Sequence, residues 1–133
     1  MSSVVIVGGG PAGYEAALVA RQLGAEVTLV AAAGLGGSAV LTDVVPSKGL
    51  IGVAEVLTRA TDAAALGIEL DAAPRVNLPA VNARLRRLAA QQSADIEQRL
   101  LAEGVKLVRG SGRLVGDHVL MPFVRVESFS DNA

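Results

Sequence analysis

The sequence predicts an α/β fold, in which helices cover a mostly parallel β-sheet. Residues 4–7 form an apolar run that ends at Gly8, which is typical of a buried strand. Residues 11–23 have helical character and are followed by Gly24, and a second apolar segment spans 25–32. A strand, a glycine turn, a helix and a second strand within roughly 30 residues form a βαβ unit, whose strands are parallel.

The composition supports this class and excludes several others. Hydrophobic residues make up 51% of the 133 residues and aromatic residues only 2%, as in parallel sheets between helices. Lys and Arg (12) nearly balance Asp and Glu (13), so charge gives no reason to expect a nucleic acid or a membrane as partner. Cysteine is absent, which excludes disulfides and thiolate metal sites, and we expect no metal. The N-terminus lacks a secretion signal or membrane anchor, so we expect a cytoplasmic protein.

Two further helices are predicted after the second strand. One spans 46–65, and the other runs from 77 to 103 and ends at Gly104. The apolar face of the first helix consists of Leu50, Val53, Leu57, Ala60 and Ala64. The apolar stripe of the second consists of Val81, Leu85, Leu88, Ile96 and Leu100.

The remaining segments complete one domain. Residues 67–76 are predicted to form a connector or a short edge strand. Residues 105–116 should contain a strand that joins the sheet, and 118–128 have more β-character. We therefore expect one domain over 1–120, followed by an irregular C-terminal tail over 121–133.

The turn between the first strand and the first helix carries the spacing G-x-G-x-x-G, as Gly8, Gly10 and Gly13. The first glycine permits a tight turn, the second lets a pyrophosphate approach the backbone, and the third lets the helix pack closely on the strand. The free N–H groups at the helix N-terminus attract phosphate. The turn therefore predicts dinucleotide binding; the alternative is a glycine-rich turn that binds nothing.

One part of this pattern is missing. An acidic residue usually follows the glycines by about 20 residues, at the end of the second strand, and binds the ribose. Here that place falls at Ala31, which is followed by Ala32 and Ala33. Losing a charge-assisted hydrogen bond costs about 1.5–3 kcal/mol. We therefore expect nucleotide binding to be weakened but not abolished.

Two stretches together resemble a known family. "VVIVGGGPAGYEAALVARQLGAEVTLV" and "GLGGSAVLTDVVPSKGLI" are similar to the start of the FAD-dependent pyridine nucleotide–disulfide oxidoreductases, which include dihydrolipoamide dehydrogenase. The resemblance covers residues 3–115. It implies a Rossmann-like, three-layer FAD/NAD(P)-binding domain, which would be incomplete here.

The second stretch departs from the family at its redox centre. The family motif is G-G-T-C-x-x-x-x-C-x-P-S-K, and this chain has Ala39 and Val44 where the two cysteines belong. Because disulfide exchange needs an attacking thiolate and a receiving sulfur, disulfide reduction is excluded and we assign no catalytic residue. The chain is most similar to the cysteine-lacking NAD(P)H:quinone reductase branch, which implies FAD, an NAD(P)H donor and a small, quinone-like acceptor.

The resemblance also implies the residues of the cofactor site. Those expected at the pyrophosphate are Gly8, Gly10, Pro11, Ala12 and Gly13. Gly37 is expected in the same site, with Ser38 near the phosphate or ribose. Lys48 is expected close to the flavin ring, where a cation stabilises negative charge, and Gly112 against the adenine.

Family members continue with a second glycine motif and a dimerisation domain, which do not occur before Ala133. Family members are homodimers through that dimerisation domain. Because both parts are missing from this sequence, we expect a truncated or frame-shifted chain that is inactive in isolation. The first hypothesis is the FAD-binding portion of a flavin-dependent NAD(P)H oxidoreductase. The alternative is a stand-alone or remnant nucleotide-binding module without catalytic activity.

Other candidate residues have simpler interpretations. Arg84, Arg86 and Arg87 are expected to form a solvated helix face rather than a phosphate site. His118 has no neighbouring catalytic constellation in the sequence, and we expect an ordinary surface or strand histidine. Asp43 is expected in a loop or turn; the alternative is an acid that neighbours the flavin.

Overall fold

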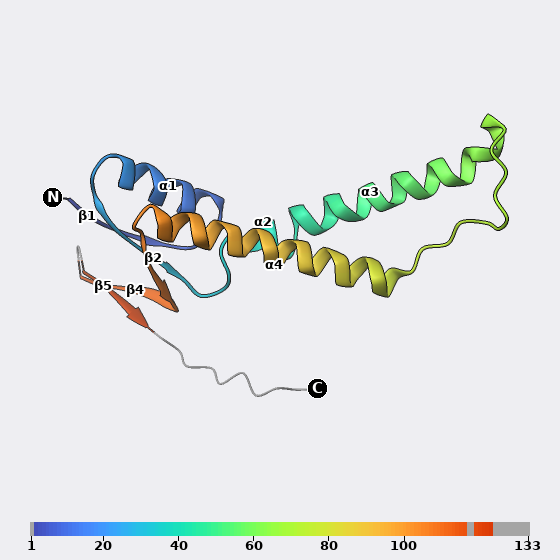
Figure 1. Ribbon diagram of the computed structural model, residues 1–133. Helices are drawn as coiled ribbons and strands as arrows, with labels where there is room; N and C mark the ends of the chain where they lie inside the picture. The colour runs from blue at the N-terminus through green and yellow to red at the C-terminus, as the bar shows by residue number, and fades with distance from the viewer. Residues whose placement is uncertain (1, 117–118, 124–133) are drawn as a thin grey trace.

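The computed structural model describes residues 2–116 and 119–123, and a parallel sheet lies at one end of it (Figure 1). The sheet contains β1 (Ser3–Val7), β2 (Glu26–Ala31) and β3 (Lys106–Arg109) in the order β1-β2-β3. Both pairings are parallel. The predicted βαβ unit is therefore confirmed, as is the addition of a strand after residue 105.

Helices α1 (Pro11–Gln22) and α4 (Leu78–Ala102) begin and end close to their predicted limits. Pro11 occupies the first turn of α1, where its missing N–H costs nothing. Asn77 caps α4, since its side-chain oxygen accepts a hydrogen bond from the Ala80 amide at 3.1 Å. Sequence signals at the ends of these two helices were therefore sufficient to locate them.

The region between β2 and α4 differs from the prediction. A short helix α2 (Gly37–Leu41) comes first, then α3 (Val44–Thr61), which passes into the 3₁₀ helix η1 (Asp62–Leu66). The expected helix over 46–65 therefore begins earlier and is shorter as an α-helix. The segment 67–76 is a connector without a strand.

An antiparallel hairpin follows the sheet. Strand β4 (Ser111–Gly116) pairs with β5 (Val119–Phe123), with an irregular register between Leu114 and Gly116. Strand β5 runs to Phe123, and the boundary expected between a domain over 1–120 and a tail over 121–133 stays a prediction. The rest of that tail, 124–133, and His118 lie outside the described residues.

The core lies between α1, the sheet and the end of α4. Its buried residues are Ala17, Ala25, Val27, Leu29, Ala31, Leu35, Leu100 and Val105. Strand β2 is central, and four of its residues are buried. Strand β1 was predicted to be buried, but it lies at the sheet edge, where Val5 and Val7 are 44% and 53% exposed. A short apolar run indicates a strand but does not indicate which neighbours will cover it.

Helices α3 and α4 pack side by side and extend away from the sheet (Figure 1). No residue of α3 is buried, and the apolar face predicted over 46–65 is only partly covered: Leu50 of α3 and Ala64 of η1 are exposed. On α4, Ala89 and Ser93 are buried where the predicted stripe had Leu88, which is 39% exposed. Small side chains are buried there because α4 lies close to the loop after β2, as the closeness of Ser93 to Gly34 shows.

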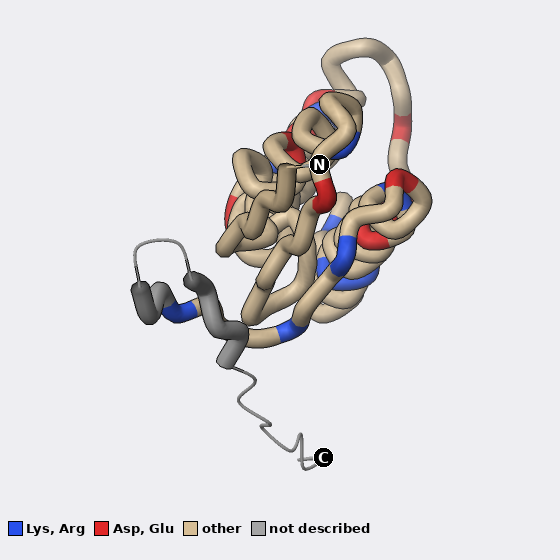
Figure 2. The backbone as a smooth tube through the Cα atoms, turned by 90° about the vertical axis from the view of Figure 1, so that its left-hand side faces the viewer, with Lys and Arg blue, Asp and Glu red and all other residues tan. Residues whose placement is uncertain are grey.

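Figure 2 shows charges of both signs interspersed over the helices. Arg84, Arg86 and Arg87 are all exposed, as expected for a solvated face. Within the described part of the chain, no helix combines the length and the apolar character needed to cross a bilayer.

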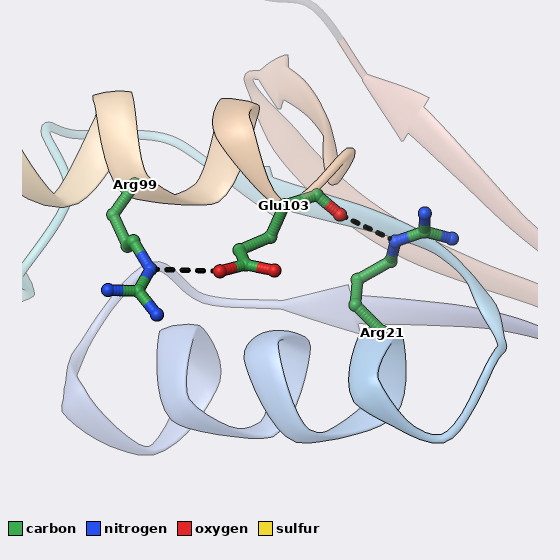
Figure 3. Close-up of polar contacts among 3 residues, drawn as sticks. All are labelled: Arg21, Arg99 and Glu103. Carbon is green, nitrogen blue, oxygen red and sulfur yellow. Dashed lines mark hydrogen bonds and ion pairs between the residues drawn. The ribbon is translucent and has the colours of Figure 1, made fainter.

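Arg21 joins the ends of α1 and α4 (Figure 3). Its Nε donates a hydrogen bond to the main-chain oxygen of Glu103 at 2.8 Å, and its Nη1 donates to the oxygen of Ala25 at 2.7 Å. The Glu103 carboxylate pairs with Arg99 at 3.1 Å. Because α4 leads directly into β3, this contact fixes where β3 enters the sheet, next to the first half of β2, where Lys106 pairs with Thr28.

Candidate functional site

Two glycines of the turn between β1 and α1 are required by the fold itself, one by its backbone conformation and one by packing. Gly8 has φ +110°, which disfavours other residues, and its amide donates to the oxygen of Val30 at 2.8 Å. A Cβ at Gly13 would clash with the backbone oxygen of Gly8. The turn is thereby held tightly between β2 and the first turn of α1.

Gly10 has no such packing reason to be a glycine. It is the N-cap of α1, with an extended backbone and no side-chain cap. No described atom outside its chain neighbours lies within 4 Å of the position that a Cβ at Gly10 would take. The N-terminus of α1 therefore faces open space with its partial positive charge, next to Pro11 and Ala12, which are exposed. This arrangement is suited to an anion that approaches the backbone closely.

The start of α2 packs directly on this turn. The Gly36 amide donates to the oxygen of Gly9 at 2.8 Å. A Cβ at Gly37 would lie only 2.9 Å from the Cα of Gly10. The exposed residue Ser38 follows. The structure thus brings Gly37 and the glycine turn together; the cofactor contacts expected of Gly37 and Ser38 stay predictions.

A cavity of about 580 Å³ lies beyond the ends of β2 and β3. This volume falls in the range of small-molecule sites, about 300–1,000 Å³. Ala31, Ala32 and Ala33 form part of its wall and present only methyl groups. Its polar and charged side chains are Ser93, Glu97 and Arg109. The place expected to hold an acidic residue is therefore apolar, and the polar groups come from α4 and β3.

The polar side chains at this cavity differ in their burial and contacts. Ser93 is only 7% exposed. The Nη2 atom of Arg109 lies 3.4 Å from each carboxylate oxygen of Glu97. The amide of Gly110 donates to the oxygen of Ala31 at 2.9 Å, which holds the end of β3 against the end of β2.

The other predicted site residues lie on α2, α3 and β4. Lys48 is exposed on α3, and Gly112 lies on β4, opposite Pro122 of β5. Ala39 is half-buried in α2, and Val44 is the first residue of α3 and is exposed. The roles of Lys48 and Gly112 stay predictions.

Sequence reasoning missed Gly9, Ser93, Glu97 and Arg109. A Cβ at Gly9 would lie 2.8 Å from the Leu35 side chain and 2.9 Å from that of Ala31, so the middle glycine also serves packing. A signal for the α4 residues was present, because the predicted apolar stripe has no member between Leu88 and Ile96. An interruption of that kind, filled by a serine, marks a place where a helix borders a polar cavity.

Comparisons with known proteins agree with this arrangement. The model of the pyridine nucleotide-disulphide oxidoreductase family matches residues 2–124. NAD(P)H dehydrogenase (quinone) of Mycobacterium tuberculosis is 45% identical over 119 residues, which are 86% of this chain and 24% of that protein. Dihydrolipoyl dehydrogenase of Pseudomonas aeruginosa is 36% identical over 117 residues, 86% of this chain and 25% of that protein.

A solved structure is similar as well. The crystal structure of LpdA from Mycobacterium tuberculosis matches with a TM-score of 0.80 and 43% identity, over 88% of this chain and 25% of that one. The chain therefore spans about a quarter of the length of these relatives.

These findings confirm the predicted Rossmann-like fold and the resemblance, including the likeness to a quinone dehydrogenase. Both of these relatives are named as dehydrogenases. The chain belongs to the pyridine nucleotide-disulphide oxidoreductase family.

Proposed function

We propose that this chain forms the FAD-binding portion of a flavin-dependent NAD(P)H oxidoreductase of the quinone-reductase type. The observation that carries the proposal is the uncapped N-terminus of α1, where Gly10 leaves open space beside the backbone. The neighbouring cavity at the ends of β2 and β3 is large enough for the adenosine half of the same ligand.

The residues divide the binding of a dinucleotide between them. The amides that open α1 bind the diphosphate, and Gly10 permits its close approach. Ser38 and Gly37 border the same place from α2, since Gly37 packs on Gly10. Gly112 contacts the adenine and Lys48 the flavin ring, by analogy with the family.

The bound flavin would supply hydride acceptance from NAD(P)H and transfer of the electrons to an acceptor. Ala39 and Val44 carry no sulfur, so this chain offers no thiol for disulfide exchange. The reaction that remains is direct transfer of electrons to a small acceptor, such as a quinone. A relative named as a quinone dehydrogenase, 45% identical to this chain, supports that choice. We further propose that the whole enzyme is a homodimer, as the resemblance implies.

The proposal is tested by titrating the purified protein with FAD, ADP and riboflavin by isothermal titration calorimetry. We expect FAD and ADP to bind and riboflavin to bind far more weakly, because riboflavin lacks both phosphates and the adenosine. Bound FAD should also give the visible absorbance of a flavoprotein. A protein that takes up neither FAD nor ADP would contradict the proposal.

Gly10→Val places a branched side chain in the open space at α1 and should lower FAD and ADP affinity at least about a hundredfold, the effect of losing close contact with a charged group. Gly52→Val is the matched control, because a Cβ at Gly52 also meets nothing within 4 Å but lies on α3. We expect Gly52→Val to bind as the unaltered protein does. Equal FAD and ADP affinities of the two variants would show that the glycine turn is not part of the binding site.

A further inference from the structure

We propose that Glu97 on α4 binds the ribose hydroxyls of the bound nucleotide, in place of the acidic residue that is missing at position 31. This inference rests on the proposed function, since it assumes a dinucleotide whose diphosphate lies at the N-terminus of α1. It concerns how this chain recognises the sugar without an acid at the end of β2.

The geometry places Glu97 at the edge of the sheet where β2 ends. Ala31 is the last residue of β2, and Arg109 is its partner in the parallel register with β3. The Nη2 atom of Arg109 lies 3.4 Å from both oxygens of Glu97. Ala31, Glu97 and Arg109 line one cavity. The carboxylate is therefore held beside the cavity. Ala31 lines the same cavity but has no polar side-chain group to offer a ligand.

The Glu97 carboxylate retains capacity for a ligand. Its contact with Arg109 is longer than the roughly 2.7–2.9 Å of a strong charge-assisted hydrogen bond. The Glu97 side chain is 38% exposed and lines the cavity, so it is accessible to a ligand there. A carboxylate has about four acceptor positions, and the two long contacts from a single Nη2 atom leave about two of them for a ligand. Arg109, whose side chain is 85% exposed, is thus a positioning residue.

Ser93 makes this a built site rather than a surface charge. It lies one helical turn before Glu97, so the two side chains share a face of α4. Ser93 is only 7% exposed and lines the same cavity. A Cβ at Gly34 would come within 2.9 Å of its hydroxyl, so the loop after β2 closes over it. A buried hydroxyl and a carboxylate together suit a sugar that both donates and accepts hydrogen bonds.

The sign of the expected effect separates direct contact from general electrostatics. ADP is an anion, so removing a nearby negative charge without a hydrogen bond should strengthen its binding. Removing a carboxylate that accepts hydrogen bonds from the ribose should weaken it. Glu97→Gln therefore distinguishes the two, and Asp95→Asn removes the same charge from α4 at a residue outside the cavity.

The experiment titrates ADP and 2′,3′-dideoxy-ADP into the unaltered protein, Glu97→Gln and Asp95→Asn by calorimetry. We expect Glu97→Gln to lower ADP affinity roughly tenfold to a hundredfold, the effect of a lost charge-assisted hydrogen bond. It should leave the affinity for 2′,3′-dideoxy-ADP unchanged or slightly higher, because that ligand has no ribose hydroxyls to lose. Asp95→Asn should bind both ligands as the unaltered protein does.

Two results would overturn the inference while leaving the proposed function intact. One is ADP binding to Glu97→Gln that equals or exceeds that of the unaltered protein. The other is an equal loss for both ligands, which would mean that Glu97 acts on the shape of the site and not on the hydroxyls. Absence of ADP binding to the unaltered protein is a separate outcome, and it would overturn the proposed function together with this inference.

Discussion

The turn between β1 and α1 and the end of β2 border the same candidate site, yet they are built in different ways. At the turn, Gly8 is required by its positive φ and Gly13 by close packing, whereas Gly10 leaves room for a ligand. At the end of β2, Ala31 offers only a methyl group. The polar groups near it belong to α4 and β3. The first region keeps the dinucleotide-binding pattern, and the second departs from it.

The difference teaches which part of such a site can change. Helix-terminal amides are supplied by the backbone, so phosphate binding depends on shape and on the absence of side chains. Recognition of a sugar depends on one side chain, which another element can replace if it lies at the same sheet edge. Arg21 contributes to that possibility, because its contact with Glu103 fixes the end of α4 where β3 begins.

The largest expected effect is on stability, and it distinguishes Gly13, which is tightly packed, from Gly10, which is not. Gly13→Val should destabilise the fold by about 3 kcal/mol, at the upper end for overpacking, because the side chain would clash with the backbone oxygen of Gly8. Gly10→Val should leave stability nearly unchanged. Urea denaturation followed by circular dichroism measures both, and equal stabilities would contradict the packing role given to Gly13.

Arg21→Met should destabilise the protein by about 2 kcal/mol, since two carbonyl oxygens lose a charged donor. The same denaturation experiment checks it, with the exposed residue Arg86 changed to Met as the control. Nucleotide affinity at a temperature where the variant is folded should fall by less than it does in Gly10→Val. A variant as stable as the Arg86→Met control would show that the contact between α1 and α4 contributes nothing.

Ala31→Glu restores an acid at the usual place and should raise ADP affinity, by roughly tenfold if the new carboxylate gains one hydrogen bond to the ribose. The gain should be larger in the Glu97→Gln background, where the ribose has no other carboxylate. Calorimetric titration of the single and double variants provides the comparison. If both backgrounds gain equally, the two carboxylates do not serve the same hydroxyls.

The smallest expected effect concerns the stability of Glu97→Gln. The ion pair between Glu97 and Arg109 is largely exposed, and such pairs contribute about 0–1 kcal/mol. We therefore expect a midpoint of urea unfolding close to that of the unaltered protein. A large loss of stability would assign Glu97 to the fold and not to the ligand.

Much of the fold could be predicted because its signals are local. The glycine turn, Pro11 at the start of α1 and Asn77 at the start of α4 each act on neighbouring backbone groups. The exposure of β1 could not be predicted, because burial depends on what packs against the strand. Likewise, the burial of Ala89 and Ser93 on α4 depends on how closely the loop after β2 approaches.

The same distinction between local signals and contacts between distant segments applies to the candidate site. The glycine turn could be predicted from the spacing of Gly8, Gly10 and Gly13, and the absence of an acid at the end of β2 from Ala31. The cavity could not, because Ser93, Glu97 and Arg109 are distant in sequence from Ala31 and lie near it only through the parallel register of β2 and β3.

A crystal structure of the protein with ADP tests the central claim most directly. We expect the diphosphate to accept hydrogen bonds from the backbone amides that open α1, with the ribose hydroxyls donating to the Glu97 carboxylate in the cavity beyond Ala31. A diphosphate bound away from Gly10, or a cavity filled by the protein's own side chains, would contradict it.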